Sequence, residues 1–457
     1  LNLLNNARVD LTREGAYLTS ISPTTLTIGN LYGEGVFDIR FDLENELNDI
    51  IFISNSSSGN HSVNFYDKTA GAYTLTDNIS LLVVDQSNPS GNYSATYAGK
   101  IDLGGYEYNL TKANANDNWY VYLNANATSN GSSNNSNGSG SSNGTGSGNG
   151  TSGGTGGTLP PCSSAHCAVK SFLSINYLVN YADSQTLLQR MGDIREGRHD
   201  KEDVWVRTYF GRLDSFDEDT RINEARYSGI QAGIDKAYES EYATSYLGLA
   251  FGYSKSEIDY LKGHGSGNNF YGSIYASVLF NTDLYMDFLA KYNYNKNKFD
   301  TVTSNGYDVT GKGDTEGFSF DVEIGKRFDI SKLYIEPQFG VTYTNQNGAK
   351  VDSSDGMRIS LNGYDSYRIR TSLLFGYKLR DIINVYLKAG YIKELESDAS
   401  YVLNDNLLEY QLNSDIIDTS VGFTTNMNSH HLYLEGTYQI GNKFNNKKAN
   451  IGYRYNF

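Results

Sequence analysis

The two cysteines, Cys162 and Cys167, are the side chains whose spacing first suggests chemistry, with four residues between them. A structural zinc site takes about four ligands, and His166 is the one other candidate ligand nearby. The spacing therefore favours a small disulfide loop, formed in an oxidising compartment, over free thiols. We expect no metal site.

Histidines and glycine-rich segments give no catalytic pattern. The six histidines are His61, His166, His199, His264, His430 and His431. None lies near a Gly-x-Ser-x-Gly elbow, and the pair at 430–431 suits a solvated turn. The segment Gly263-His-Gly-Ser-Gly lacks the Lys-Ser/Thr of a phosphate loop, and the acidic run that starts at Asp217 suits a solvated loop. We therefore expect neither an enzyme nor a bound cofactor.

Composition favours an all-β protein. The 457 residues carry 37 Lys+Arg against 52 Asp+Glu, a formal net charge of −15, which argues against a nucleic-acid partner. Aromatics make up 13% of the chain, with Tyr 38, Gly 47 and Pro only 5, a mixture typical of strands and tight turns. No apolar run reaches about 18 residues, which excludes a transmembrane helix but not strands that cross a membrane by alternation.

Residues 1–124 contain short apolar runs separated by Gly, Asn, Asp and Ser. The runs lie at 24–28, 36–41, 49–53, 80–84, 106–110 and 119–123. Their spacing suits the coils of a β-solenoid, each of which buries its face on the next, although a β-sandwich gives a similar pattern. Because the chain begins at Leu1 without a signal peptide, we expect a processed product or part of a longer polypeptide.

A linker and a helix follow. Residues 125–162 are mostly Asn, Ser, Gly and Thr, which bury little and predict a flexible linker. Residues 163–200 predict a helix, because Val169, Phe172 and Leu173 recur at helical spacing. Polar residues interrupt this apolar face, so we expect the helix to sit among polar groups.

Residues 201–457 predict a β-barrel. In the last strand Ala449, Ile451, Tyr453, Tyr455 and Phe457 share one face, while polar or small residues occupy the other. Five short joins, near 240, 282, 330, 381 and 428, alternate with six longer polar ones at about 214–224, 255–268, 298–314, 345–364, 394–409 and 441–447. That plan is typical of an outer-membrane barrel, here of about twelve strands.

Charged residues on the polar faces would point into such a barrel. The candidates to face the helix are Arg207, Glu323, Arg327, Glu336, Arg368, Arg370, Lys388 and Arg454. A polar lumen of this kind favours a helix that threads the pore. The alternative is that these charges line a water-filled channel.

The order of these segments resembles the classical monomeric autotransporters of Gram-negative bacteria. The helix, Met191-Gly-Asp-Ile-Arg and Val204-Trp-Val-Arg-Thr-Tyr-Phe-Gly resemble the entry into that family's barrel, and Leu333-Tyr-Ile-Glu-Pro-Gln and Ile383-Asn-Val-Tyr-Leu-Lys resemble internal strands. The C-terminal end resembles the signal read by the barrel assembly machinery, which would be carried by Asn450, Gly452, Tyr455 and Phe457.

The resemblance implies that the protein functions in type V secretion. Residues 1–124 would be a β-helical passenger stem, with an autochaperone region at 60–124, and the 12-stranded barrel with its pore-spanning helix would be the translocator. The long linker and the cysteine pair depart from the family pattern. Some family members cleave themselves at an Asn-Asn pair in the helix, but Asn176 and Asn180 are separated here, so that chemistry is not supported.

We therefore expect an outer-membrane translocator that exports its own passenger, an adhesin-like protein, and anchors it on the cell surface. Expected partners are outer-membrane lipid, the barrel assembly machinery, periplasmic chaperones, and host or bacterial cells bound by the passenger. We expect the barrel to be monomeric. The alternative is a porin or channel with an attached soluble domain.

Overall fold

The structure is a computed structural model, and it describes most of the chain. The described residues are 1–12, 22–43, 45–67, 79–103, 106–113, 116–123, 163, 166–171, 179–185, 202–217, 220–260, 263–303, 308–354, 358–380, 382–403, 406–411, 414–427 and 429–457. The predicted linker lies outside them. The chain divides into two compact units, the first made mainly of residues 1–163 and the second mainly of residues 164–457, and each is described by itself.

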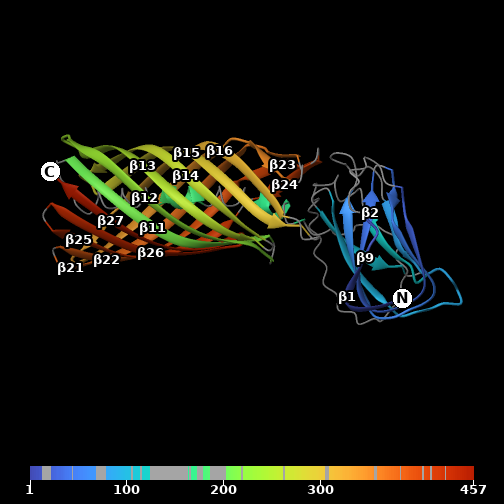
Figure 1. The fold of residues 1–457 in the computed structure, drawn as a ribbon. Helices are drawn as coiled ribbons and strands as arrows, with labels where there is room; N and C mark the ends of the chain where they lie inside the picture. The colour runs from blue at the N-terminus through green and yellow to red at the C-terminus, as the bar shows by residue number, and fades with distance from the viewer. Residues whose placement is uncertain are drawn as a thin grey trace, which may run out of the picture. The chain divides into compact units, whose positions relative to one another are not determined.

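The first unit is a β-solenoid whose strands stack mainly in parallel (Figure 1). Its strands are β1 (Asn2–Asp10), β2 (Thr25–Asp42), β3 (Leu47–Asn48), β4 (Ile50–Ser57), β5 (Asn60–Asp67), β6 (Ile79–Asp85), β7 (Asn92–Tyr93), β8 (Thr96–Leu103), β9 (Tyr106–Lys112) and β10 (Trp119–Leu123). Parallel pairing joins β1 to β2, β2 to β5 and β5 to β8. Parallel stacking of this kind makes the unit a solenoid and not an antiparallel sandwich.

Strand β2 turns from one sheet of the solenoid to the other. Its first part pairs with β4 and its second with β5, and Gly33 lies between them with a φ of 92°. That left-handed conformation suits glycine. At the C-terminal end β8, β9, β10 and β6 pair antiparallel, so a hairpin closes the stack of coils.

The solenoid core is apolar and contains a column of rings. Phe37, His61, Tyr97 and Trp119 follow one another with ring centroids 5.8, 5.4 and 5.5 Å apart. Edge-to-face and tilted pairs at this spacing are favourable. His61 is only 2% exposed, and burial lowers its pKa. The column therefore connects successive coils to the terminal hairpin through a ring whose burial disfavours its protonated form.

The second unit contains a closed antiparallel barrel of twelve long strands (Figure 1). These are β11 (Glu202–Asp217), β12 (Thr220–Glu239), β13 (Ala243–Tyr260), β14 (Gly263–Phe280), β15 (Leu284–Val302), β16 (Asp308–Lys326), β18 (Leu333–Gln346), β21 (Tyr364–Arg380), β22 (Ile383–Glu396), β25 (Asp415–Met427), β26 (His430–Gly441) and β27 (Phe444–Asn456). Strand β27 pairs with β11 and closes the barrel. Shorter strands extend it: β17 (Phe328–Ile330), β19 (Ala349–Ser353), β20 (Arg358–Leu361), β23 (Asp398–Leu403) and β24 (Asn406–Gln411).

The barrel exposes its apolar residues and buries its polar ones. In β16, Phe320 is 50% exposed, while Asp321 is 1% exposed. A water-soluble sheet protein would place these faces the other way round. The exposed apolar wall is the surface that a bilayer covers, and closure leaves no unpaired strand edge in hydrocarbon.

The bounds predicted for the six long polar joins are wrong, because strands occupy most of each range. We expected a join over 214–224, yet β11 runs to Asp217 and β12 begins at Thr220. Similarly, β19 with β20 forms a hairpin within 345–364. The backbone ladder needs no apolar alternation to continue, so polar strand ends remain paired beyond the apolar belt.

The two ends of the barrel differ. Both Glu202 and Phe457 lie at one end, where the Phe457 amide donates to the Glu202 carbonyl at 3.1 Å. The five short turns between strands lie at that same end. The extended hairpins lie at the other end. In outer-membrane barrels short turns face the periplasm and longer connections face outward, so the hairpin end is the extracellular one.

The lumen of the barrel as the candidate functional site

Helical residues 166–171 and 179–185 belong to the same unit as the barrel. All seven residues of 179–185 are buried, although several are polar: Asn180, Asp183, Ser184 and Gln185. A helix at a protein surface leaves one face exposed. Complete burial therefore means that the barrel wall surrounds this segment, as Figure 1 shows for the helical ribbon between the strands.

Asp183 fixes one side of the helix to the wall. Its carboxylate accepts hydrogen bonds from the hydroxyl of Tyr209 on β11, from Ser254 on β13 at 3.2 Å and from Asn269 on β14 at 2.5 Å. The side chain of Gln231 on β12 donates to the Asp183 carbonyl oxygen at 3.1 Å. These donors offset part of the desolvation cost of burying the carboxylate.

Three further strands also hold the helix. The Lys291 ammonium on β15 donates to the Asn180 carbonyl oxygen at 2.8 Å, and Gln439 on β26 donates to the Tyr181 hydroxyl at 2.8 Å. The Arg368 guanidinium on β21 lies 4.4 Å from the centre of the Tyr181 ring. Together with the contacts of Asp183, these interactions come from seven strands and place residues 179–185 inside the lumen.

Residues 166–171 meet the extended hairpin β23–β24. His166 hydrogen-bonds to the hydroxyl of Tyr401, and the Lys170 ammonium lies 5.8 Å from the Tyr410 ring centre. Cys167 is disulfide-bonded, while Cys162 of the predicted pair lies outside the described residues. Residues 172–178 and 186–200 of the predicted helix also lie outside them.

Seven of the eight predicted lumen charges lie on the inner faces of strands, and Arg327 lies between β16 and β17. Arg207, Glu323, Glu336, Arg368, Arg370 and Arg454 are buried, and Arg327 and Lys388 are largely covered. Ion pairs join Arg370 to Glu323, Arg368 to Glu394, Arg327 to Glu336, Lys388 to Asp418 and Arg454 to Asp203, at 2.7, 2.9, 3.2, 3.4 and 3.6 Å. Buried charges are tolerated when paired in this way. The lumen is thus a network of salt bridges around the helix.

Several residues that hold the helix were not singled out from the sequence. Asp183 is polar on a segment judged by its apolar spacing, and Tyr209, Ser254, Asn269 and Gln439 are uncharged. Each of the four wall residues occupies an inward position of its strand. They could have been found from the sequence by considering every inward strand position whose side chain can form hydrogen bonds, whether or not it is charged.

The last strand shows where the proposed assembly signal lies. Asn450 and Gly452 face inward, while Tyr455 and Phe457 face outward, 37% and 59% exposed. A Cβ atom at Gly452 would lie 3.0 Å from Nε of Arg207, whose guanidinium lies 4.4 Å from the Tyr433 ring centre. Because glycine has no side chain, position 452 leaves space for the Arg207 side chain to lie across the seam between β27 and β11.

The described part of the chain contains no group of three or more His, Cys, Asp or Glu side chains placed to hold a metal ion. Its helical segments include none that is long and apolar enough to cross a membrane.

Comparisons with known proteins agree with this architecture. The autotransporter beta-domain family matches residues 204–439 and the pertactin family matches residues 2–123. The probable autotransporter YcgV of Escherichia coli K12 is 36% identical over 99% of this chain and 48% of its own. The autotransporter adhesin/invasin TibA of Escherichia coli is 25% identical over 99% of this chain and 48% of its own.

A solved structure has the same barrel fold. The translocator domain of the autotransporter NalP from Neisseria meningitidis superposes with a TM-score of 0.50 and 16% identity, covering 62% of this chain and 98% of that one. The chain thus spans about half the length of the curated relatives it matches. It belongs to the autotransporter family, and residues 202–457 are its outer-membrane translocator barrel.

Proposed function

We propose that the barrel exports the N-terminal solenoid across the outer membrane, and that the helix stays in the lumen afterwards to anchor it. The observation that carries this proposal is the helix at 179–185, enclosed by the wall and in contact with seven of its strands. A small-solute channel would need an open path where these residues lie. Family membership favours export over conduction as well.

The solenoid itself supplies a driving force in this proposal. A stack of coils folds by nucleation at one point and propagation to neighbouring coils. The antiparallel hairpin β9–β10 closes the C-terminal coils and buries Val121 and Leu123. Residues 60–124 would fold first outside the cell and act as an autochaperone for the segments that follow them through the barrel.

Protease shaving of intact cells tests the proposal. After proteinase K treatment we expect antibodies against residues 1–124 to lose their cell-associated signal, while a fragment of roughly residues 166–457 persists in the outer membrane. Cells permeabilised before treatment provide the reference digest. Protection of the stem until permeabilisation would place it in the periplasm and favour the channel with an attached soluble domain.

The exported part is proposed to be adhesin-like. The support is the similarity over 99% of the chain to a protein named an autotransporter adhesin/invasin, together with a solenoid that offers long, regular faces. Catalysis forms no part of this proposal, because the sequence contains no nucleophile motif. Removal of residues 1–124 should abolish cell aggregation or host-cell binding, and unchanged binding would exclude a role for this stem.

Recognition of the last strand by the barrel assembly machinery, after transport by periplasmic chaperones, completes the proposal. Gly452→Val would displace Arg207 from beneath the seam and should lower the yield of folded barrel. Gly272→Val is the matched control, because a Cβ there meets only Phe251, at 3.5 Å. Equal yields of the two variants, measured by heat-modifiable migration on gels, would contradict a role for Gly452.

A further inference from the structure

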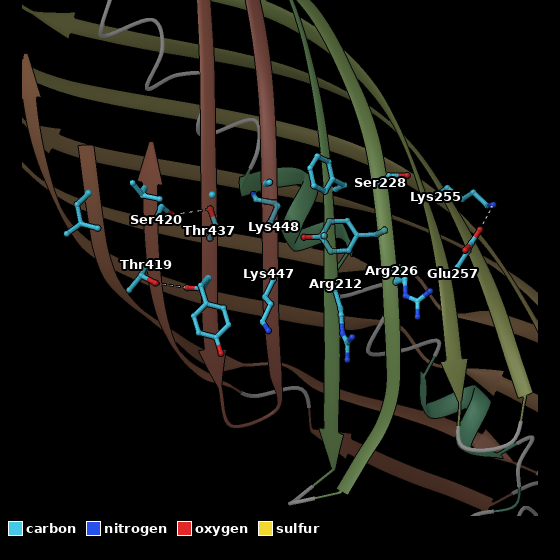
Figure 2. A pocket seen from close by; sticks show the side chains of 18 residues that line it. Arg212, Arg226, Ser228, Lys255, Glu257, Thr419, Ser420, Thr437, Lys447 and Lys448 are labelled. Carbon is cyan, nitrogen blue, oxygen red and sulfur yellow. Dashed lines mark hydrogen bonds and ion pairs between the residues drawn. The ribbon is translucent and has the colours of Figure 1, made fainter. Parts of the chain in front are cut away.

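The outer face of the barrel carries a row of basic side chains near its extracellular end. The register of the strands places Lys447 on β27, Arg212 on β11 and Arg226 on β12 beside one another, and all three point outward. Lys255 on β13 lies one outward position nearer the periplasm, beside Ser228. Figure 2 shows these side chains on neighbouring strands.

Directly on the membrane side of this row the wall is hollowed. The neighbouring outward positions include Gly436, Ala449 and Ser228, whose small side chains leave a groove of about 850 Å³. Exposed apolar side chains border it: Phe210, Leu387, Val421 and Tyr438. A Cβ at Gly436 would meet only Val421, at 4.0 Å, so this floor of the groove is open.

The next outward row confirms the direction of the membrane. Ile451, Thr208 and Ile230 follow toward the periplasm, and the two isoleucines are 49% and 50% exposed. The apolar belt therefore begins at the groove, and the basic row stands at its extracellular border. In an outer-membrane barrel this border is the level of lipid headgroups.

Acidic side chains nearby leave the basic row accessible. Arg212 pairs with Asp214 and Glu224 at 3.1 and 2.9 Å, Arg226 with Glu224 and Asp259 at 3.4 and 3.9 Å, and Lys255 with Glu257 at 2.8 Å. The side chains of Arg212, Arg226 and Lys255 are 46–67% exposed, so each cation keeps a side that a ligand can reach. Their partners Asp214 and Glu224 are only 18% and 11% exposed, whereas the Lys255–Glu257 pair is exposed on both sides and weak. Asp214, Glu224 and Asp259 form a row on the loop side of the cations, and Glu257 lies beside Arg226 within the basic row. On β27 and β11 a negative headgroup arriving from the membrane side therefore meets Lys447 and Arg212 before any of these carboxylates.

We propose that this face binds one phosphorylated, acylated lipid of the outer leaflet. Its phosphate contacts Lys447, Arg212 and Arg226, with Lys255 at the edge, and an acyl chain lies along Gly436 and Ala449. Arginine binds phosphate through two parallel hydrogen bonds, which suits the paired guanidinium groups of adjacent strands. The groove volume lies within the range of small-molecule sites, and apolar contact accounts for retention of the chain.

Binding of diphosphoryl lipid A to the full chain in detergent, followed by native mass spectrometry, tests this inference. We expect the variant Arg212→Gln/Arg226→Gln/Lys447→Gln to bind at least about tenfold more weakly. The matched control is Lys296→Gln/Lys298→Gln/Lys312→Gln, which removes three outward cations from β15 and β16. The control should retain wild-type affinity, and equal losses in both variants would show unspecific attraction and overturn the proposal.

A second pair of variants tests the groove with every cation in place. Gly436→Leu fills the floor and should weaken binding several-fold, whereas Gly272→Leu, on the outer face of β14, should not. Wild-type affinity of Gly436→Leu would overturn the acyl-chain site. Inorganic phosphate serves as the competitor: displacement of lipid A by millimolar phosphate would reduce the site to an anion site and contradict the lipid assignment.

Discussion

Asp183 illustrates how much one residue contributes to the occupied lumen. Its carboxylate accepts bonds from Tyr209, Ser254 and Asn269, which come from three strands. A buried donor that loses its partner costs about 1–3 kcal/mol. A few polar contacts, and not a broad apolar face, therefore determine the position of the helix.

Asp183→Ala should weaken docking of the helix by about 3 kcal/mol, because it leaves buried donors without an acceptor. The measurement is the thermal melting of the full chain in detergent, together with hydrogen exchange of residues 179–185. Asp329→Ala is the control, since Asp329 forms only a half-exposed pair with Lys378. Unchanged exchange in the first variant would show that Asp183 does not hold the helix.

His61 gives the solenoid a pH dependence. Its pKa in the folded unit is lowered by burial, so the unfolded chain binds a proton more readily. The contribution of neutral His61 to the free energy of unfolding is then fully present above about pH 6.5. It decreases as the pH falls toward the pKa of His61 in the folded unit. We therefore expect the free energy of unfolding of the N-terminal unit to decrease between pH 7 and pH 5.

Substitution of the ring tests this dependence. His61→Phe retains an aromatic ring between Phe37 and Tyr97 but cannot accept a proton, and it should flatten the pH profile of the urea midpoint of the N-terminal unit. His264→Phe, at an exposed position, should leave the profile unchanged. A profile that stays steep in His61→Phe would assign the dependence to other groups.

At the scale of elements, the helix and the barrel wall differ in what determines them. Each wall strand is held by the ladders of its two neighbours, whereas the helix is held by side chains. Removal of the helix should therefore leave the closed barrel intact. The lumen that remains would be lined by paired charges and filled with water.

Deletion of residues 166–185 should raise single-channel conductance in planar bilayers several-fold over the intact chain. The reason is that the described helical residues are enclosed by strands on all sides. Deletion of residues 130–149, an equal length of the Asn/Ser/Gly segment, serves as control. High conductance in the intact protein, or none after the helix deletion, would contradict a plugged lumen.

At the scale of the whole molecule, the chain combines one unit that buries its apolar residues with another that exposes them. The solenoid buries apolar residues such as Phe37 and Ile39, both 0% exposed, whereas the barrel exposes residues such as Phe251 and Val421, 70% and 62% exposed. Each unit keeps its own hydrogen-bonded sheets. Damage to one core is therefore expected to spare the other.

Val121→Asp places a charge in the closing hairpin of the solenoid, where Val121 is 0% exposed. The cost, about 4 kcal/mol, should unfold the N-terminal unit and make it trypsin-sensitive, while the barrel keeps its heat-modifiable migration. Tyr122→Asp, at a residue 48% exposed on the same strand, should remain resistant. Loss of the folded barrel in Val121→Asp would show that the two units depend on each other.

The barrel was predictable because its evidence is local. A strand records its two environments in alternate residues, so Phe318, Phe320 and Val322 against Ser319, Asp321 and Glu323 identify a wall between lipid and lumen without knowledge of any partner strand. The short turns then give the number of strands. Because that number is even, the first and last strands of the barrel have their outer ends at the same end of the barrel. The inward direction of seven of the eight predicted lumen charges follows from the same parity.

Tertiary structure alone decided which residues meet. Asp183 contacts residues 26 to 86 positions away, and Tyr181 meets Gln439 at a separation of 258, because closure and stagger of the barrel bring distant strands to one level. Extension of the hairpins beyond the belt also depended on backbone pairing, which polar sequences do not reveal. The basic row and its groove likewise exist only because register places Lys447, Arg212 and Arg226 side by side. The sequence thus determined whether each strand side chain points into the lumen or outward. The closed barrel determined which other side chains it contacts.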